Sequence, residues 1–89
     1  MRQKARVDSN QAEIVKALRK IGAAVYVIGL PVDLLVWHRG TLHLVEVKVE
    51  GGTYTKQQEK FMSEWPGEVH TVRTPEEAVA AVIGKEAMK

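Results

Sequence analysis

The sequence contains no cysteine, which excludes disulfide bonds and thiolate metal sites. It also has no apolar run near the roughly 20 residues that a membrane span requires. The chain begins with MRQKAR, which contains no apolar core of the kind that secretory signals carry. From these absences we expect a protein without a membrane partner that resides in a reducing compartment.

A strong charge of one sign is missing as well. Thirteen Lys and Arg residues stand against eleven Asp and Glu residues, which gives a formal net charge of +2. That excess alone does not predict a nucleic-acid partner. Its distribution is more informative, because the chain begins with a basic arm over residues 1–9. The cations of this arm, Arg2, Lys4 and Arg6, can follow phosphates, although a solvated terminus is the preferred explanation if no other feature points to nucleic acid.

The remainder, residues 10–89, is expected to form a single domain with a small core. Apolar residues at helical spacing predict helices, and short apolar runs bounded by glycine and proline predict strands. The expected helices are residues 10–21, 55–65 and 75 onward, and the expected strands are residues 23–28, 33–37, 42–49 and 68–72. The first strand is almost continuously apolar, so we expect it to be covered on both faces. The expected fold is therefore α/β in the order αβββαβα, with a mixed four-stranded sheet flanked by helices.

Two neighbouring strands carry the residues with the clearest chemistry. A two-residue turn at positions 39–40 places Asp33 directly opposite Glu46 in an antiparallel pair. Such opposite side chains lie about 5 Å apart at Cβ, and Lys48, two residues beyond Glu46, shares their face. Two adjacent carboxylates repel each other unless a positive charge lies between them, and a divalent cation is the natural candidate. The alternative is that Asp33 caps a turn while Glu46 and Lys48 are solvated.

This arrangement resembles the PD-(D/E)xK nuclease superfamily, in which an acid opens one strand and E-x-K follows on the next. Asp33 is the acid, and Glu46 and Lys48 belong to the second strand. Glu13 lies on a preceding helix and Gln58 on a following one, in the order that the superfamily uses. The resemblance covers most of the chain.

Two stretches are most similar to the VRR-NUC branch of that superfamily, whose compact members include phage and bacterial junction nucleases. They are GLPVD at residues 29–33 and TKQQ at residues 55–58. One departure is plain, because Val32 separates Pro31 from Asp33 and the literal Pro-Asp pair is absent. Only the carboxylate has chemistry to perform, so this variation is tolerable.

The resemblance implies a restriction-endonuclease-like core and an endodeoxyribonuclease that depends on Mg²⁺, for which Mn²⁺ can substitute. The implied metal ligands are Asp33, Glu46, the Val47 carbonyl and Glu13. Lys48 would orient or polarise the attacking water. Gln58 would hydrogen-bond near that water or near the scissile phosphate.

Branched DNA is the implied partner, and resolution of Holliday junctions by a homodimer is the expected function. A homodimer also suits a small core, which gains stability by burying surface against a partner. Flap- or nick-directed cleavage is an alternative, and so is a non-catalytic nucleic-acid-binding subunit that keeps the fold. The expected location is the cytoplasm of a bacterial or phage-infected cell, or the nucleus of a eukaryote. The expected phosphate contacts are Arg2, Lys4, Arg6, Lys56 and Lys60.

Some of these residues also have simpler interpretations. Asn10-x-x-Glu13 is a capping-box pattern, so Glu13 can serve the helix start instead of the metal, or serve both. Gln58 lies on an apolar helix stripe and can be held there by structural hydrogen bonds alone. The histidines are scattered along the sequence and their spacing does not predict a zinc site; they are His38, His43 and His70.

Overall fold

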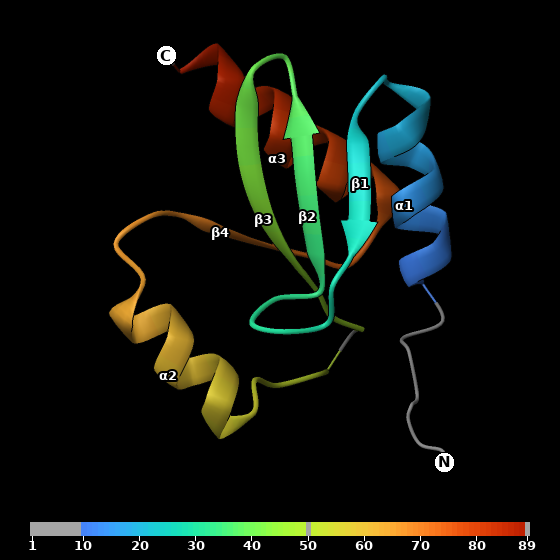
Figure 1. Cartoon of the computed structure of the whole chain (residues 1–89). Coiled ribbons are helices and arrows are strands. Elements are labelled where there is room, and N and C mark those ends of the chain that lie inside the picture. The colour runs from blue at the N-terminus through green and yellow to red at the C-terminus, as the bar shows by residue number, and fades with distance from the viewer. Residues whose placement is uncertain (1–9, 50, 89) are drawn as a thin grey trace.

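The computed structural model describes residues 10–49 and 51–88, so the basic arm lies outside the described residues. The helices are α1 (Gln11–Lys20), α2 (Lys56–Glu64) and α3 (Pro75–Ala87), and the strands are β1 (Ala24–Val27), β2 (Leu34–His38), β3 (Thr41–Val47) and β4 (Val69–Val72). The sheet order is β1-β2-β3-β4, antiparallel except for the parallel pair β3–β4 (Figure 1). The expected element order and mixed four-stranded sheet are confirmed. No helix in the described part of the chain is long and apolar enough to cross a bilayer.

A two-residue turn joins β2 to β3. Arg39 and Gly40 both have a positive φ, of 52° and 77°, as a type I′ turn requires. Such turns match the twist of the strands they connect, so the hairpin continues in register as far as Leu34 opposite Val45. The register expected from the sequence is confirmed.

Side-chain caps explain where two of the helices begin. At α2, Thr55 Oγ1 accepts from the Gln58 N–H at 3.2 Å, and Gln58 Oε1 accepts from the Thr55 N–H at 2.9 Å, which completes a capping box. At α3, Thr74 Oγ1 accepts from the Glu77 N–H at 3.0 Å, and Pro75 occupies the first helical position. Both starts follow from the local sequence.

The capping box considered as an alternative for Glu13 does not form at the start of α1. Asn10 makes no side-chain cap, because its backbone is already helical rather than extended, with φ −86° and ψ −7°. Its amide nitrogen instead donates to the Lys48 carbonyl at 3.0 Å and to the Arg73 carbonyl at 2.6 Å. These bonds tie the start of α1 to the chain just beyond β3 and β4.

Helices α1 and α3 pack together against one face of the sheet, and α3 passes behind the strands in Figure 1. The strand residues of the core occupy alternate positions, as burial of a single face requires. The buried core residues include Ile14, Leu18, Val25, Leu34, Val36, Val45, Val47, Val72, Ala78 and Val82.

The opposite face of the sheet is largely uncovered. Tyr26 of β1 is 70% exposed while its neighbour Val25 is buried, so the expectation that this strand is covered on both faces is wrong. Helix α2 does not supply the missing cover. It contributes no buried side chain, and in Figure 1 it lies beyond the ends of the strands, away from the hairpin turn.

Candidate metal and nuclease site

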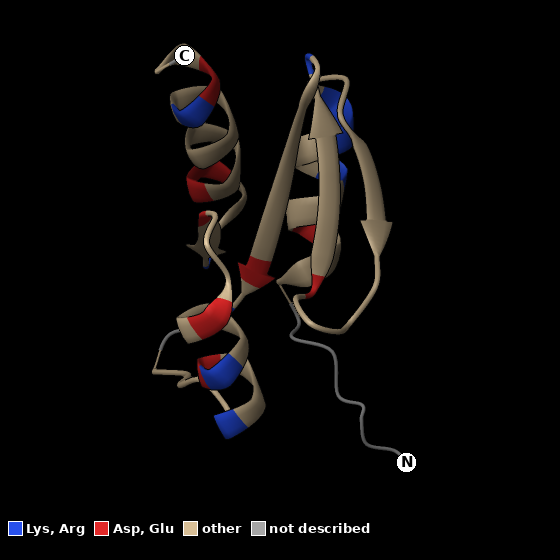
Figure 2. Cartoon of the chain, turned by 60° about the vertical axis from the view of Figure 1, so that its left-hand side comes forward, with Lys and Arg blue, Asp and Glu red and all other residues tan. Residues whose placement is uncertain are grey.

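Asp33 and Glu46 lie where β2 begins and β3 ends, one position beyond the pair Leu34 and Val45. Both belong to the alternate positions that face away from α1 and α3. Figure 2 shows acidic residues at these two neighbouring strand ends. The Val47 N–H donates to Asp33 Oδ2 at 2.8 Å, which holds that carboxylate beside β3. The structure therefore brings together the two acids that the sequence selects.

Glu46 is buried although its face of the sheet is largely open, with only 2% of the residue exposed. Its Oε2 accepts a short hydrogen bond from Gln58 Nε2 and lies 3.5 Å from Lys48 Nζ. Its Oε1 is buried without a hydrogen-bond partner. A buried carboxylate oxygen in that state costs free energy, and a bound cation would satisfy it.

The electrostatics of Glu46 point the same way. Burial, followed by the negative charge of Asp33, raises the pKa of Glu46 from 4.5 to about 7, against the opposing effect of the Lys48 ammonium. Because the negative charge of Asp33 disfavours ionisation of Glu46, added positive charge between the two residues is stabilising. Pairs perturbed by burial and by a specific charged neighbour are characteristic of functional sites.

Lys48 is held in place by several acceptors. Its Nζ donates to Gln58 Oε1 at 2.8 Å and to the Thr53 carbonyl at 3.1 Å, and forms the ion pair with Glu46. The same ammonium lies 5.2 Å from the centre of the Tyr54 ring, within the range of a cation–π contact. With its side chain only 12% exposed, Lys48 is a fixed positive charge beside the acids.

Gln58 links the acid to the lysine. Its Nε2 donates to Glu46, and its Oε1 accepts from Lys48 and also from the Thr55 N–H. The residue therefore bonds both the helix start and Glu46, as structural hydrogen bonding requires. Its role beside the attacking water or the scissile phosphate stays a prediction. A cavity of about 330 Å³ adjoins it, lined by Leu30, Pro31, Gln57 and Gln58.

The carboxylates of Asp33 and Glu46 and the carbonyl of Val47 are oxygen ligands of the kind that a hard divalent cation prefers. The N–H and C=O of one residue point to the same side of an extended strand, so the Val47 carbonyl lies on the side of Asp33. Across residues 10–49 and 51–88, no three His, Asp or Glu side chains converge as ligands. A cation held by Asp33, Glu46 and this carbonyl would keep several waters, as Mg²⁺ usually does.

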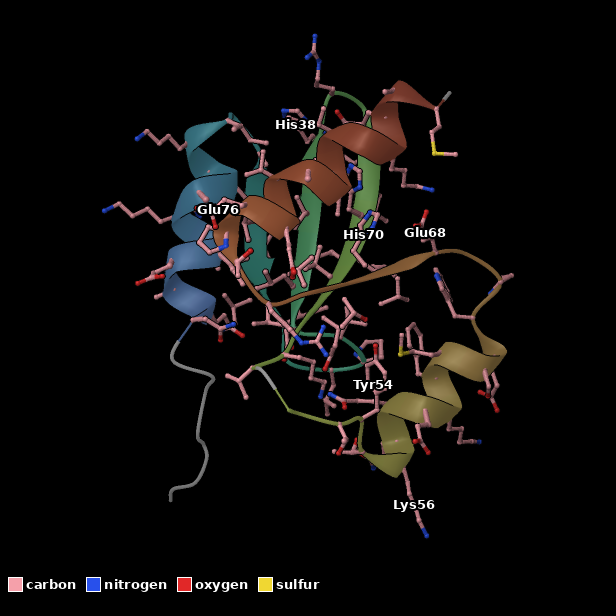
Figure 3. All side chains as sticks on the ribbon, turned by 180° about the vertical axis from the view of Figure 1, so that it is seen from behind. His38, Tyr54, Lys56, Glu68, His70 and Glu76 are labelled. Atoms are coloured by element: carbon pink, nitrogen blue, oxygen red, sulfur yellow. The ribbon has the colours of Figure 1, made fainter. Side chains whose placement is uncertain are left out.

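Other residues selected from the sequence lie outside this network. Glu13 is exposed on the first turn of α1, in the layer behind the sheet, and the described contacts do not join it to the acids. Lys56 is exposed at the start of α2 and points away from the molecule in Figure 3. Lys60 pairs with Glu64 at 3.2 Å on the exposed surface of α2. The three cations of the arm lie outside the described residues.

The three histidines, in contrast, are not scattered in space. They form a connected chain with Glu86 of α3, and Figure 3 labels two of them along that helix. His43 Nδ1 lies 3.2 Å from His70 Nε2, and His43 Nε2 lies 2.8 Å from Glu86 Oε2. His38 Nδ1 lies 2.9 Å from the same carboxylate. We call His38, His43, His70 and Glu86 the histidine cluster.

The sequence does contain a signal for this cluster. His43 alternates with Val45 and Val47 along β3, which places it on the buried face, and His70 stands in the same relation to Val72 on β4. Distance along the chain hid their proximity, because the pairing of β3 with β4 brings together residues from opposite sides of α2.

Comparison with known proteins adds no assignment. No family model, curated protein or solved structure matches this chain. The resemblance to PD-(D/E)xK nucleases therefore stays a prediction from the sequence.

Proposed function

We propose that this protein is a Mg²⁺-dependent endonuclease that hydrolyses phosphodiester bonds in DNA, built on a restriction-endonuclease-like core. The observation that carries the proposal is Glu46, a buried carboxylate with an unpartnered oxygen, set between Asp33 and Lys48. Burying charged groups costs folding free energy, especially in a small fold. A role in binding a cation and a phosphate would explain why the chain places charges here.

Each residue of the network has a role in that chemistry. A cation bound by Asp33, Glu46 and the Val47 carbonyl would neutralise the carboxylates and lower the pKa of a bound water. The Lys48 ammonium would stabilise the negative charge that develops on the phosphate. Gln58 holds that ammonium in position by accepting from it at 2.8 Å.

Branched DNA is the substrate we propose, cleaved by a homodimer as in junction resolution. The described residues form one α/β unit, and Asp33 and Glu46 lie at one end of its two central strands, next to the start of α2. Symmetric incision of a four-way junction requires two such sites related by a twofold axis. Flap- or nick-directed cleavage uses the same residues and remains the alternative substrate preference.

One observation favours a second function. Lys48 and Gln58 already have protein partners for their polar atoms, as they would in a purely structural network. A non-catalytic nucleic-acid-binding subunit would keep such a network without using it. The two functions differ in one respect, because only the nuclease needs a divalent cation.

Cleavage of labelled four-way, flapped, nicked and linear DNA, in Mg²⁺ and in EDTA, tests the proposal. Glu46→Gln removes the charge but keeps an oxygen for Gln58, and Glu76→Gln changes an exposed acid of α3 as a matched control. We expect Glu46→Gln to lose at least about 100-fold in rate and Glu76→Gln to cleave normally. Wild-type cleavage by purified Glu46→Gln would refute the nuclease. DNA binding without any metal-dependent cleavage would establish the second function.

A further inference from the structure

The sheet face that α1 and α3 leave uncovered carries apolar side chains in two rows across the strands. One row joins Ala24, Trp37 and Leu42, and the next joins Tyr26, Leu35 and Leu44. We call these six side chains the open face. None of them is charged, and Figure 2 shows no acidic or basic residue on the strands until the acidic end. A solvated face of an antiparallel sheet normally carries polar residues, so we expect another surface to pack against these apolar side chains.

The open face is large enough for a specific contact. Tyr26 is 70% exposed, Trp37 54% and Leu42 49%. Because a large aromatic side chain can bury about 150–250 Å², the six side chains offer roughly 400–500 Å². That area lies within the range of about 300–600 Å² found for the largest apolar patch of a monomer, a patch that often has a function. Two such faces in contact would bury about 1,000 Å² in total, which is the lower bound for a specific interface.

The chemistry of the open face selects its occupant. DNA phosphates would require cations, and this face has none. Helix α2 is engaged at the acidic end, where Gln58 contacts Glu46, and it leaves the hairpin end bare. Residues 1–9 are mostly charged or polar, and they would lose hydration on an apolar surface without gaining partners. A flat, neutral and apolar surface is complementary to a second copy of itself.

We propose that a second copy of this chain docks on the open face, sheet against sheet about a twofold axis. Such an interface is isologous, so the same six side chains contribute from both copies. Trp37 and Tyr26 are its anchors, since large aromatic residues dominate binding energy at interfaces. The inference rests on the homodimer of the proposed function and assigns its surface. Each acidic site stays outside the contact, because both apolar rows lie on the hairpin side of Asp33 and Glu46.

Sedimentation of the full chain over a concentration series tests this with a matched pair of variants. Leu42→Arg and Ile83→Arg each place a cation at an aliphatic position, 49% exposed on the open face and 48% exposed on α3. We expect wild type and Ile83→Arg to dimerise, and Leu42→Arg to raise the dissociation constant by more than about tenfold. The inference is overturned if wild type stays monomeric up to about 100 μM, or if Leu42→Arg dimerises as well as Ile83→Arg.

A second measurement does not depend on disrupting the interface. Trp37 and Trp65 are the two tryptophans of the chain, so Trp65→Phe leaves Trp37 as the single reporter. We expect its emission to shift to longer wavelength on dilution, as Trp37 returns to water. A dimer that dissociates without this shift uses another surface and overturns the assignment. Cleavage is scored separately: a dimer that cleaves nothing contradicts the proposed nuclease. A monomer that cleaves contradicts this inference and the homodimer of the proposed function, and leaves the nuclease chemistry standing.

Discussion

Glu46 is the residue at which a proton and a metal ion compete for the same carboxylate. Because its pKa is about 7, Glu46 is largely protonated near pH 6 and largely ionised near pH 8. We therefore expect Mg²⁺ or Mn²⁺ to bind about tenfold more tightly at the higher pH, since metal ligands must be deprotonated. Calorimetric titration of the metal-free protein at both pH values measures this. Glu46→Gln, which cannot ionise, is the control, and an unchanged wild-type affinity would contradict the prediction.

The same residue sets how the stability of the metal-free protein depends on pH. A folded-state pKa of about 7, against 4.5 when unfolded, means that the fold retains a proton that the unfolded chain releases. Its stabilising effect is full below about pH 4.5 and is lost as the pH rises through about 7. Above pH 7, Glu46→Gln should exceed wild type by about 3 kcal/mol in unfolding free energy, and the difference should vanish in acid. Urea unfolding in EDTA checks this. A variant that is weaker than wild type at both pH values would count against it.

The sequence predicts the pairing of Asp33 with Glu46 because that pairing depends only on a local turn. Arg39 and Gly40 fix the hairpin register, and the alternation of side chains along each strand places Asp33 and Glu46 on the same face. The bonds of Gln58 to Glu46 and Lys48 could not be predicted in the same way. They depend on the path of the segment between β3 and α2, which places the start of α2 beside the end of β3. No periodic pattern in the sequence predicts that path.

Among the elements, α3 is attached to the sheet by polar contacts as well as by its apolar stripe. Glu86 near its end contacts His38 of β2 and His43 of β3, and His43 in turn contacts His70 of β4. At the rim, Glu68 lies 3.7 Å from His70 Nδ1 and pairs with Lys85 of α3 at 3.3 Å. The histidine cluster therefore joins one helix to three strands.

Loss of this attachment in acid is the prediction at the element scale. Partial burial raises the pKa of Glu86, but hydrogen bonds from His43 and then His38 outweigh it and lower the pKa overall. Burial lowers the pKa of His70. In both cases the unfolded chain takes up protons first. Stability is therefore lost as the pH falls, below about 6.5 through His70 and below about 4.5 through Glu86.

Glu86→Gln isolates the contribution of the carboxylate. The variant should be less stable than wild type at pH 7, and the difference should shrink as the pH falls through the folded-state pKa of Glu86. Urea unfolding along a pH series measures it, with Glu76→Gln on the same helix as the control. Equal stability of Glu86→Gln and wild type at pH 7 would show that the cluster does not stabilise α3.

The sequence predicts the positions of the helices and strands well, but it does not predict which face of the sheet the helices cover. Apolar spacing and the caps at Thr55 and Thr74 locate α2 and α3 to within a residue or two. The apolar run that contains Tyr26 indicates a strand but does not say what lies against it. Helices α1 and α3 lie on one face of the sheet and leave the other face open. An apolar strand sequence is the same whether a helix or a second copy of the chain packs against it.

At the scale of the whole molecule, the described surfaces differ in charge. The open face is neutral, the acidic site lies at one end of the same sheet, and Lys56 and Lys60 are exposed on α2 beside that end. DNA that reaches the acidic site would therefore meet cations on α2. The basic arm, residues 1–9, is expected to add three more phosphate contacts.

Removing the charges of the arm should weaken binding to every DNA shape rather than change the preference for branched DNA, because phosphate contacts position a protein without specifying sequence or shape. Replacing Arg2, Lys4 and Arg6 with Gln should make the slope of log affinity against log salt concentration shallower by about 2.7, or 0.9 for each cation. Binding to a four-way junction and to a linear duplex over a salt series measures this. Deletion of residues 1–9 is a second test, because it removes the same three cations together with the single acid of the arm, Asp8. A variant that binds duplex as before but loses the junction would show instead that the arm recognises branching.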